Sequence, residues 1–148
     1  MISFLMGIIE EKNENSAIIN VNGVGFNVIV STNTLSSLPL EGETAKIFTY
    51  MAVREDDISL YGFSSLEERE IFNKLTTVSG IGPKMAIGIL SGLNLSDLVV
   101  AIIKEHSKLL SQIKGLGKKT AERLCLELKD KLSPLPSQDN VTFDLEYD

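Results

Sequence analysis

Residues 75–86 read Leu75-Thr-Thr-Val78-Ser-Gly80-Ile81-Gly82-Pro-Lys84-Met-Ala86, and residues 110–121 read Leu110-Ser-Gln-Ile113-Lys-Gly115-Leu116-Gly117-Lys-Lys119-Thr-Ala121. The leucine, both glycines, the lysine and the alanine recur at a constant offset of 35 residues, and two apolar positions between them stay apolar. A repeat at a fixed offset indicates one supersecondary unit that is used twice. The second half of the chain is therefore organised around this duplicated segment.

Each copy is typical of two helices joined by a tight Gly-X-Gly turn. The first glycine allows a left-handed backbone that a side chain would resist, and the apolar residue after it can pack beneath both helices. The second glycine opens the next helix, whose first N–H groups lack helical partners and bind phosphate readily. Lys84 and Lys119 add a cation in the first helical turn, where the helix dipole favours acids. This placement indicates that an anion binds there.

These features resemble the helix-hairpin-helix motif, which binds the DNA backbone without reading its sequence. One copy alone would be hard to distinguish from an ordinary helical hairpin with a glycine turn, which is common. Two copies with matched lysines make that interpretation much weaker. The candidate DNA-binding residues are those of both turns and the helix starts that follow: Gly80, Ile81, Gly82, Lys84, Gly115, Leu116, Gly117, Lys118, Lys119, Thr120 and Arg123.

Composition describes a soluble globular chain of one or two small domains. Of 148 residues, 43% are hydrophobic and 23% are charged, and no apolar run is long enough to span a bilayer. The N-terminus has no basic region and is a poor signal peptide. The single cysteine, Cys125, excludes an internal disulfide and fits a reducing cytoplasm. We therefore expect a cytoplasmic protein.

The net charge of −6 is distributed unevenly. Residues 1–63 carry 3 basic and 8 acidic side chains, and residues 133–148 carry 4 acids and no base. Residues 64–132, which hold the repeat, carry 11 basic and 8 acidic side chains, a net charge of +3. Association with DNA depends on local potential, so the acidic total does not exclude it.

Residues 1–62 predict five short strands, near residues 5–12, 16–21, 24–31, 45–53 and 57–61, separated by turn residues such as Asn22-Gly23. Residues 36–42 form a longer connection between the third and fourth strands. This pattern suits a small Greek-key barrel such as an OB fold. An SH3-like barrel fits almost as well, because periodicity cannot separate the two.

The turn between the last two strands, Arg54-Glu55-Asp56-Asp57, holds three consecutive acids. By composition alone we favour a solvated hairpin tip. The alternative is a negative point that faces phosphate and repels DNA strands.

Residues 64–132 predict helices throughout. Ser64 and Glu67 have the spacing of a capping box, so a helix is expected from about Ser65 to Thr77, burying Leu66, Ile71, Phe72 and Leu75. Pro83 suits the first position of the next helix. The last helix, residues 118–132, has an apolar stripe that includes Cys125 as an inert core residue. Residues 133–148, rich in proline and acids, predict a flexible linker, in which residues 141–147 alternate like a strand that a partner could order.

The chain as a whole resembles the RuvA family over residues 1–132. The resemblance is highly specific and rests on Val53-Arg54-Glu55-Asp56, Leu60-Tyr61-Gly62-Phe63, Gly80-Ile-Gly-Pro-Lys84 and Gly115-Leu-Gly-Lys-Lys-Thr-Ala-Glu-Arg123-Leu. It implies an α+β multidomain chain: an OB-fold barrel at 1–63, an all-α tandem helix-hairpin-helix domain at 64–132 and a linker at 133–148.

The resemblance also implies a function. The barrel would assemble four copies, as a homotetramer or an octamer on DNA, around an open, square Holliday (four-way) junction in recombination, DNA repair and the SOS response to DNA damage. Glu55 and Asp56 would form an acidic pin at its centre, which overturns the composition-based preference for this turn. The ATPase motor RuvB and the resolvase RuvC would be partners. Family members continue into a helical domain that contacts the motor. This sequence ends at Asp148, within the expected linker, so junction binding rather than motor contact is expected of these residues.

Three classes of function remain to be distinguished. The leading one is a non-catalytic, junction-specific DNA-binding subunit without cofactor, and a generic tandem-hairpin duplex binder or scaffold is the alternative. A DNA glycosylase needs a pocket for a flipped base, and this chain has no tryptophan and no aromatic-lined pocket in its pattern. Neither a nucleotide-binding G-x-x-x-x-G-K-[ST] loop nor a metal-ligand spacing occurs, so ATP hydrolysis would belong to a partner.

Overall fold

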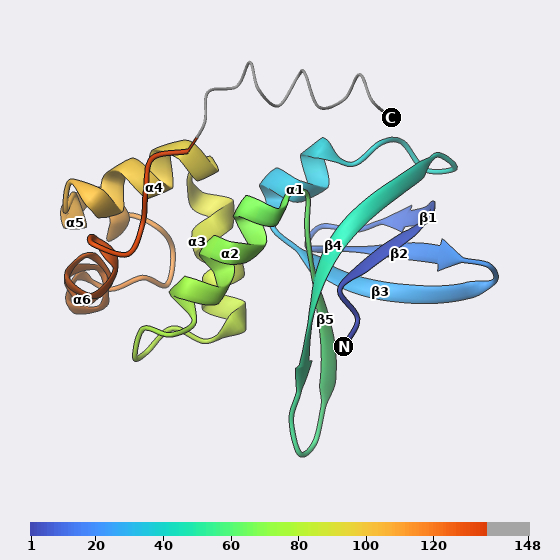
Figure 1. Ribbon diagram of the computed structural model, residues 1–148, viewed down its shortest axis with the longest axis horizontal. Helices are drawn as coiled ribbons and strands as arrows, with labels where there is room; N and C mark the ends of the chain where they lie inside the picture. Colours follow the sequence, from blue (N-terminus) through green and yellow to red (C-terminus); the bar gives the residue numbers. More distant parts are fainter. Residues whose placement is uncertain (136–148) are drawn as a thin grey trace.

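A computed structural model describes residues 1–135, which form a β-barrel followed by a bundle of short helices (Figure 1). The strands are β1 (Phe4–Lys12), β2 (Ser16–Val21), β3 (Val24–Val30), β4 (Thr44–Val53) and β5 (Ile58–Phe63). The helices are α1 (Thr32–Ser37), α2 (Leu66–Leu75), α3 (Pro83–Gly92), α4 (Leu95–Ile103), α5 (Ser107–Leu110) and α6 (Lys118–Leu128). The α+β class predicted from the sequence is confirmed.

The barrel closes in the order β1-β2-β3-β5-β4, with β1 paired to β4. All pairs are antiparallel except β3 and β5, which run parallel through Ile29 opposite Tyr61 and Val30 opposite Gly62. Each strand of the described barrel therefore pairs with two neighbours, although β3 and β5 pair at only these two positions. This topology, with a helix between the third and fourth strands, is OB-like and resolves the alternative of an SH3-like barrel.

Apolar and polar residues alternate along the strands, and the apolar side chains point inward and fill the barrel. Ile9, Ile19, Val28 and Ile47 are fully buried in its interior. A second core runs through the helical region and reaches the outside of the barrel, where Phe72 of α2 packs against aromatic rings of β4 and β5, including Phe63 at a centroid distance of 4.9 Å. The outer face of β4 and β5 therefore belongs to the same hydrophobic core as the helices.

Several local expectations are wrong in detail. The connection at 36–42 begins as the end of helix α1. The cap of α2 is Ser65, whose side chain accepts a hydrogen bond from the N–H of Glu68, rather than the expected pair of Ser64 and Glu67. Leu66 is 49% exposed because it lies on the outer face of α2. The helix ends at Leu75, two residues before the expected Thr77.

The last helix is shorter than expected, because α6 ends at Leu128 rather than Leu132. Its apolar stripe is confirmed, since Ala121, Leu124, Cys125 and Leu128 are all buried, and Leu132 stays buried beyond the helix end. The expected linker and strand at 133–148 lie outside the described residues from position 136 onward.

Candidate nucleic-acid interface

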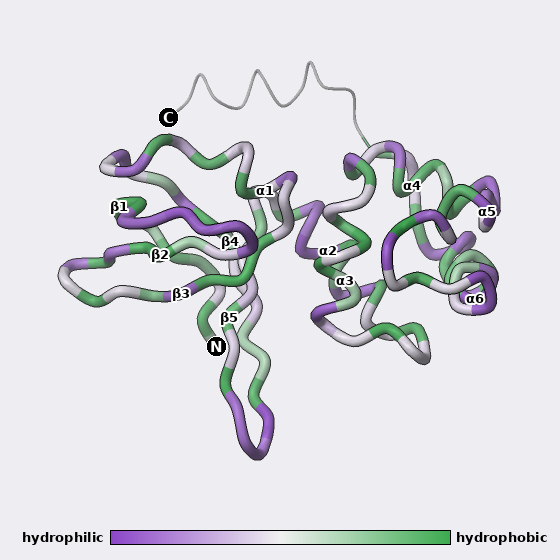
Figure 2. The backbone as a smooth tube through the Cα atoms, turned by 180° about the vertical axis from the view of Figure 1, so that it is seen from behind, coloured by the Kyte–Doolittle hydropathy of each residue, from purple (hydrophilic) through white to green (hydrophobic). Residues whose placement is uncertain are grey.

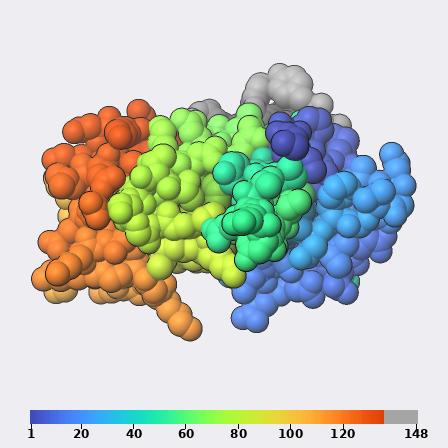
Figure 3. All heavy atoms as spheres, turned by 90° about the horizontal axis from the view of Figure 1, so that it is seen from below, coloured from blue at the N-terminus to red at the C-terminus, as the bar shows by residue number. Residues whose placement is uncertain are grey.

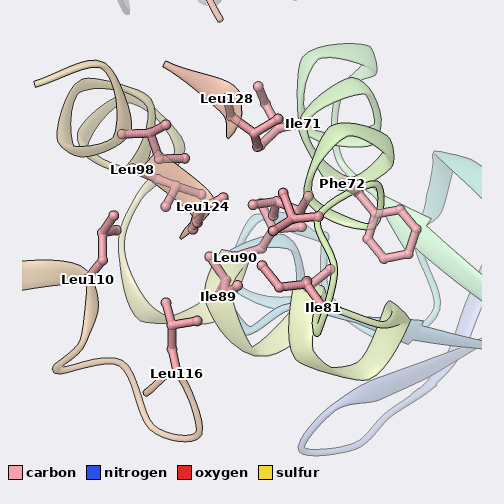
Figure 4. Close-up of a cluster of buried hydrophobic side chains, with 14 of the residues drawn as sticks. Ile71, Phe72, Ile81, Ile89, Leu90, Leu98, Leu110, Leu116, Leu124 and Leu128 are labelled. Carbon is pink, nitrogen blue, oxygen red and sulfur yellow. The ribbon is translucent and has the colours of Figure 1, made fainter. Parts of the chain in front are cut away.

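The two Gly-X-Gly turns have the same backbone geometry. Gly80 and Gly115 have φ values of +92° and +88°, in the left-handed region that favours glycine. The next residues, Ile81 and Leu116, are 4% and 3% exposed and point into the helical core (Figure 4). Their side chains are therefore anchors, and they can serve a DNA site only through the backbone that they hold in place.

Each turn leads directly into a helix whose start lacks a side-chain cap. Gly82 precedes α3 and Gly117 precedes α6, both in extended conformation and without a capping hydrogen bond. The first helical hydrogen bonds are donated by Ala86 to Gly82 O and by Ala121 to Gly117 O, both at 2.9 Å. The N–H groups before these alanines have no partner within their helices and are available to an anion.

Lysines surround both helix starts. Lys84, Lys118 and Lys119 are exposed, and none of them forms an ion pair within residues 1–135. Lys114, directly before Gly115, is exposed as well, whereas the matching position in the first copy is Ser79. The second turn is thus the more basic one. The sequence-based candidates did not include Lys114, which lies one residue before the Gly-X-Gly turn.

Arg123 lies one helical turn beyond Lys119 on α6. Its Nε donates to Glu127 Oε2 at 2.9 Å, four residues along the helix. Both side chains are partly exposed, so this pair is weak. An approaching phosphate can compete for the guanidinium, whose other donors are not engaged in this pair.

The two turns lie against each other. The position that a Cβ on Gly80 would take is 3.9 Å from Cγ2 of Thr120, and the corresponding position on Gly115 is 3.5 Å from Cε of Met85. Gly80 and Gly115 are equivalent in the repeat, and so are Met85 and Thr120. The contacts are therefore reciprocal, as expected when a pseudo-twofold axis relates the two copies. The starts of α3 and α6 therefore lie side by side, each against the turn of the other copy.

The acidic turn forms the tip of the long β4–β5 hairpin, which projects from the barrel (Figure 1). The Arg54 N–H donates to Asp57 O at 2.8 Å and closes the turn. Glu55 and Asp56 are exposed at the tip, which is the hydrophilic end of the hairpin in Figure 2. No interaction within residues 1–135 neutralises their carboxylates.

The acidic hairpin and the first turn are neighbours, although about thirty residues of chain separate them. A cleft of about 450 Å³ lies between them, and Figure 3 shows the hairpin beside the start of α3. Its walls are Ala52, Arg54, Asp56, Asp57, Ser59 and Tyr61 on the barrel side and Gly82, Pro83, Lys84 and Met85 on the helical side. No local sequence pattern predicts that Asp56 and Asp57 lie across a cleft from Lys84, because this arrangement depends on how α2 docks on the barrel.

Two further side chains within residues 1–135, Cys125 and His106, are of types that can be reactive or bind a metal. Burial raises the pKa of the Cys125 thiol above its ordinary value, and the nearby Glu105 raises it further, so the thiol stays protonated and unreactive. His106, the only histidine, is exposed at the start of α5. Within residues 1–135 no cluster of three acidic, histidine or cysteine side chains could hold a metal.

No single helix among the described residues has the length and apolar character needed to cross a membrane. Only α3 and α4 taken together reach that length and composition, and they are bent by 102° at their junction.

Comparison with known proteins places this architecture among described families. The family described as RuvA N-terminal domain matches residues 1–62, and the SAM-like helix-hairpin-helix tandem matches residues 72–130. Similar chains include those named "Holliday junction branch migration complex subunit RuvA" from Chromobacterium violaceum (48% identical over 133 residues, covering 90% of this chain and 68% of that one) and Neisseria meningitidis (48% over 132 residues, 89% and 68%). The chain of the same name from Aromatoleum aromaticum is 47% identical over 132 residues, covering 89% and 66%. This chain thus spans about two thirds of the length of these relatives.

Proposed function

Since this chain belongs to the RuvA family, we propose that it binds Holliday junctions, holds them open and flat, and supports RuvB-driven branch migration without catalysing a reaction itself. The observation that carries this proposal is the pair of reciprocal hairpin turns, whose lysines form no ion pair within residues 1–135, together with the acidic hairpin tip beside the first turn. The proposed roles divide the chain into the barrel at 1–63, the DNA-binding helices at 64–132 and a linker at 133–148.

The two hairpin turns of one chain would bind the phosphate backbones of the two strands in one DNA arm. The N–H groups at the starts of α3 and α6 would donate to phosphate oxygens, and Lys84, Lys118 and Lys119 would supply charge. The pseudo-twofold relation suits the two antiparallel strands of a duplex, which are themselves related by a twofold axis. None of these groups distinguishes bases, so binding would be independent of sequence and strongly dependent on salt.

The acidic tip would act by repulsion. Glu55 and Asp56 would face phosphates at the centre of the junction, where like charges a few ångströms apart repel each other by about 1 kcal/mol even in water. Such a tip would keep the strands apart at the crossover and direct them into separate arms. The cleft between Asp56 and Lys84 offers both signs of charge along the path of a strand.

Junction specificity would come from assembly. We propose a homotetramer, or an octamer on DNA, in which four barrels surround the crossover and four pairs of hairpin turns bind the four arms. RuvB and RuvC would be partners in the complex. The cytoplasm is the proposed compartment.

Competition and mass measurements test this function. We expect the protein to bind a synthetic four-way junction at least tenfold more tightly than a duplex or single strand of equal length, and light scattering should give four or eight chains per junction. Equal affinity for junction and duplex would instead identify a generic tandem-hairpin DNA-binding protein. Binding to none of these DNAs would indicate a scaffold.

A further inference from the structure

Glu68 is a buried carboxylate in the first turn of α2 and is 5% exposed. Its Oε2 accepts a hydrogen bond from Ser31 Oγ at 2.9 Å, and its Oε1 accepts from Thr34 Oγ1 and from the Ser64 N–H at 3.0 Å. Ser31 and Thr34 belong to the cap and first turn of α1, at the barrel, and are themselves buried. One side chain of the helical region is thus held by two hydroxyl groups of the barrel.

Helix α1 also holds the far end of α3. Asn33 Nδ2 donates to Leu90 O at 2.7 Å and to Leu93 O at 2.9 Å, and the Thr32 N–H donates to Ser91 Oγ at 3.0 Å. This short helix therefore contacts both α2 and α3, and Figure 1 shows it between the barrel and the helices. The hydrogen bonds of Glu68 and Asn33 connect the two halves of the molecule at the same place.

The position of α3 determines where the first hairpin turn lies. The helix has ten residues and is about 15 Å long. The C-terminal end of α3 lies at α1. Its N-terminal end holds Lys84, which lines the cleft opposite the acidic tip. A rotation of roughly 10° about the α1 contact would move the first turn by about 2.5 Å over that length. A movement of this size is comparable to the length of a hydrogen bond to phosphate.

An apolar residue at position 68 would hold α2 against the barrel with less desolvation. A buried carboxylate carries a large desolvation penalty, and no lysine or arginine within residues 1–135 pairs with Glu68. Its hydrogen bonds, however, require fixed directions and distances, whereas the hydrophobic contribution of apolar contacts is non-directional. The arrangement therefore favours one orientation of the helices relative to the barrel.

We propose that Glu68 is a positioning residue for junction recognition: it sets the orientation of the helical region relative to the acidic hairpin, and thereby the preference for a four-way junction over a duplex. This rests on the proposed function. A duplex arm contacts only the two hairpin turns, which move together, so duplex binding does not depend on that orientation. A junction must fit the turns and the acidic tip at the same time, so junction binding does depend on the orientation of the helical region relative to the tip.

The test compares Glu68→Ala with Glu67→Ala. Glu67 is the preceding residue, is exposed, and makes no hydrogen bond to the barrel within residues 1–135, so both variants lose one carboxyl group from the first turn of α2. We expect Glu68→Ala to reduce the ratio of junction to duplex affinity about tenfold, with duplex affinity changed less than twofold. Glu67→Ala should keep the wild-type ratio. If Glu68→Ala does not fold, Thr34→Val, which removes one donor hydroxyl and keeps its shape, should lower the ratio about threefold.

A distance measurement without DNA tests the orientation itself. Spin labels at Glu14→Cys on the barrel and Glu122→Cys on α6 occupy exposed positions, and labelled chains can be diluted with unlabelled ones to suppress distances between subunits. We expect a single narrow distance in the wild-type and Glu67→Ala backgrounds and a broad or shifted one with Glu68→Ala. An unchanged distance, an unchanged affinity ratio, or a parallel loss of both affinities would overturn the proposal. If the unmodified protein shows no junction preference, the proposed function fails, while the distance measurement still decides whether Glu68 orients the helices.

Discussion

Gly92, the last residue of α3, lies directly against Ile113, the residue two positions before Gly115. A Cβ on Gly92 would be 2.8 Å from Cγ1 of Ile113, closer than real Cβ contacts allow. Ile113 is a branched, buried side chain beneath the second turn. The close approach therefore connects the helix that follows the first turn to the base of the second.

Gly92→Ala should destabilise the fold. The added methyl group must displace Ile113, and such overpacking costs about 1–3 kcal/mol. Urea unfolding measures the change. Gly88→Ala is the matched control, because the same methyl group in the middle of α3 meets nothing within 4 Å and should stabilise the helix by about 0.5–1 kcal/mol. Equal stability of the two variants would contradict the close contact.

The two glycines of the first turn should respond differently to alanine. Gly80→Ala places a side chain at φ +92° and should lower the unfolding free energy by about 1–2 kcal/mol. Gly82 has extended backbone with open space around it, so Gly82→Ala should leave stability nearly unchanged while its methyl group blocks the approach of a phosphate. Thermal unfolding and junction titration of both variants separate the two effects. Strong DNA binding by Gly82→Ala would show that phosphate does not approach this turn.

The lysines at the helix starts should contribute to the salt dependence of binding. Lys84→Ala and Lys119→Ala should each weaken binding to every DNA sequence alike and reduce the slope of log K against log salt by about 0.9 for each lost phosphate contact. Lys46→Ala removes the same charge from the barrel, where Lys46 lies over the Phe4 ring, and should leave the slope unchanged. A new sequence preference in the lysine variants would argue for contacts with bases.

Removal of the acidic charges at the tip should tighten DNA binding and should reduce the unpairing of bases at the crossover. The double variant Glu55→Gln, Asp56→Asn loses two exposed charges, so at low salt each substitution should favour DNA by roughly 0.5–1 kcal/mol. Fluorescence of 2-aminopurine at the crossover should show less unpairing than with the native tip. Glu14→Gln, at a distant turn of the barrel, is the control. Weaker binding by the double variant would mean that the tip attracts rather than repels DNA.

Cys125 should make the fold less stable in alkali. Its pKa lies above the ordinary 9.0 in the folded state because of burial and Glu105. The unfolded chain therefore loses this proton first, so the contribution is fully present below about pH 9 and is lost as pH rises towards the folded pKa. Cys125→Ala should flatten the decline of the melting temperature between pH 8 and 10. A thiol reagent should modify native Cys125 slowly and the unfolded chain rapidly, and fast native modification would contradict its burial.

Local patterns were sufficient where the relevant interactions span only a few residues. The left-handed Gly80 and Gly115, the buried Ile81 and Leu116 and the apolar stripe of α6 all follow from conformational preferences and spacings within one turn of chain. The cap of α2 shows the limit of such patterns. Ser64 and Ser65 each have a glutamate three residues later, so spacing alone does not distinguish them as caps. With Ser65 as the cap, Glu68 is placed where its carboxylate accepts hydrogen bonds from Ser31 and Thr34.

The sequence alone determined the duplicated turns, the basic segment that holds them, the acidic tip and the number of strands, because each is set by neighbouring residues. The tertiary structure decided that β3 pairs with β5 to close the barrel, that Gly80 meets Thr120, and that the acidic tip faces Lys84 across a cleft. These pairings join segments about thirty or more residues apart. They depend on how whole helices and strands pack, and no local spacing specifies that packing.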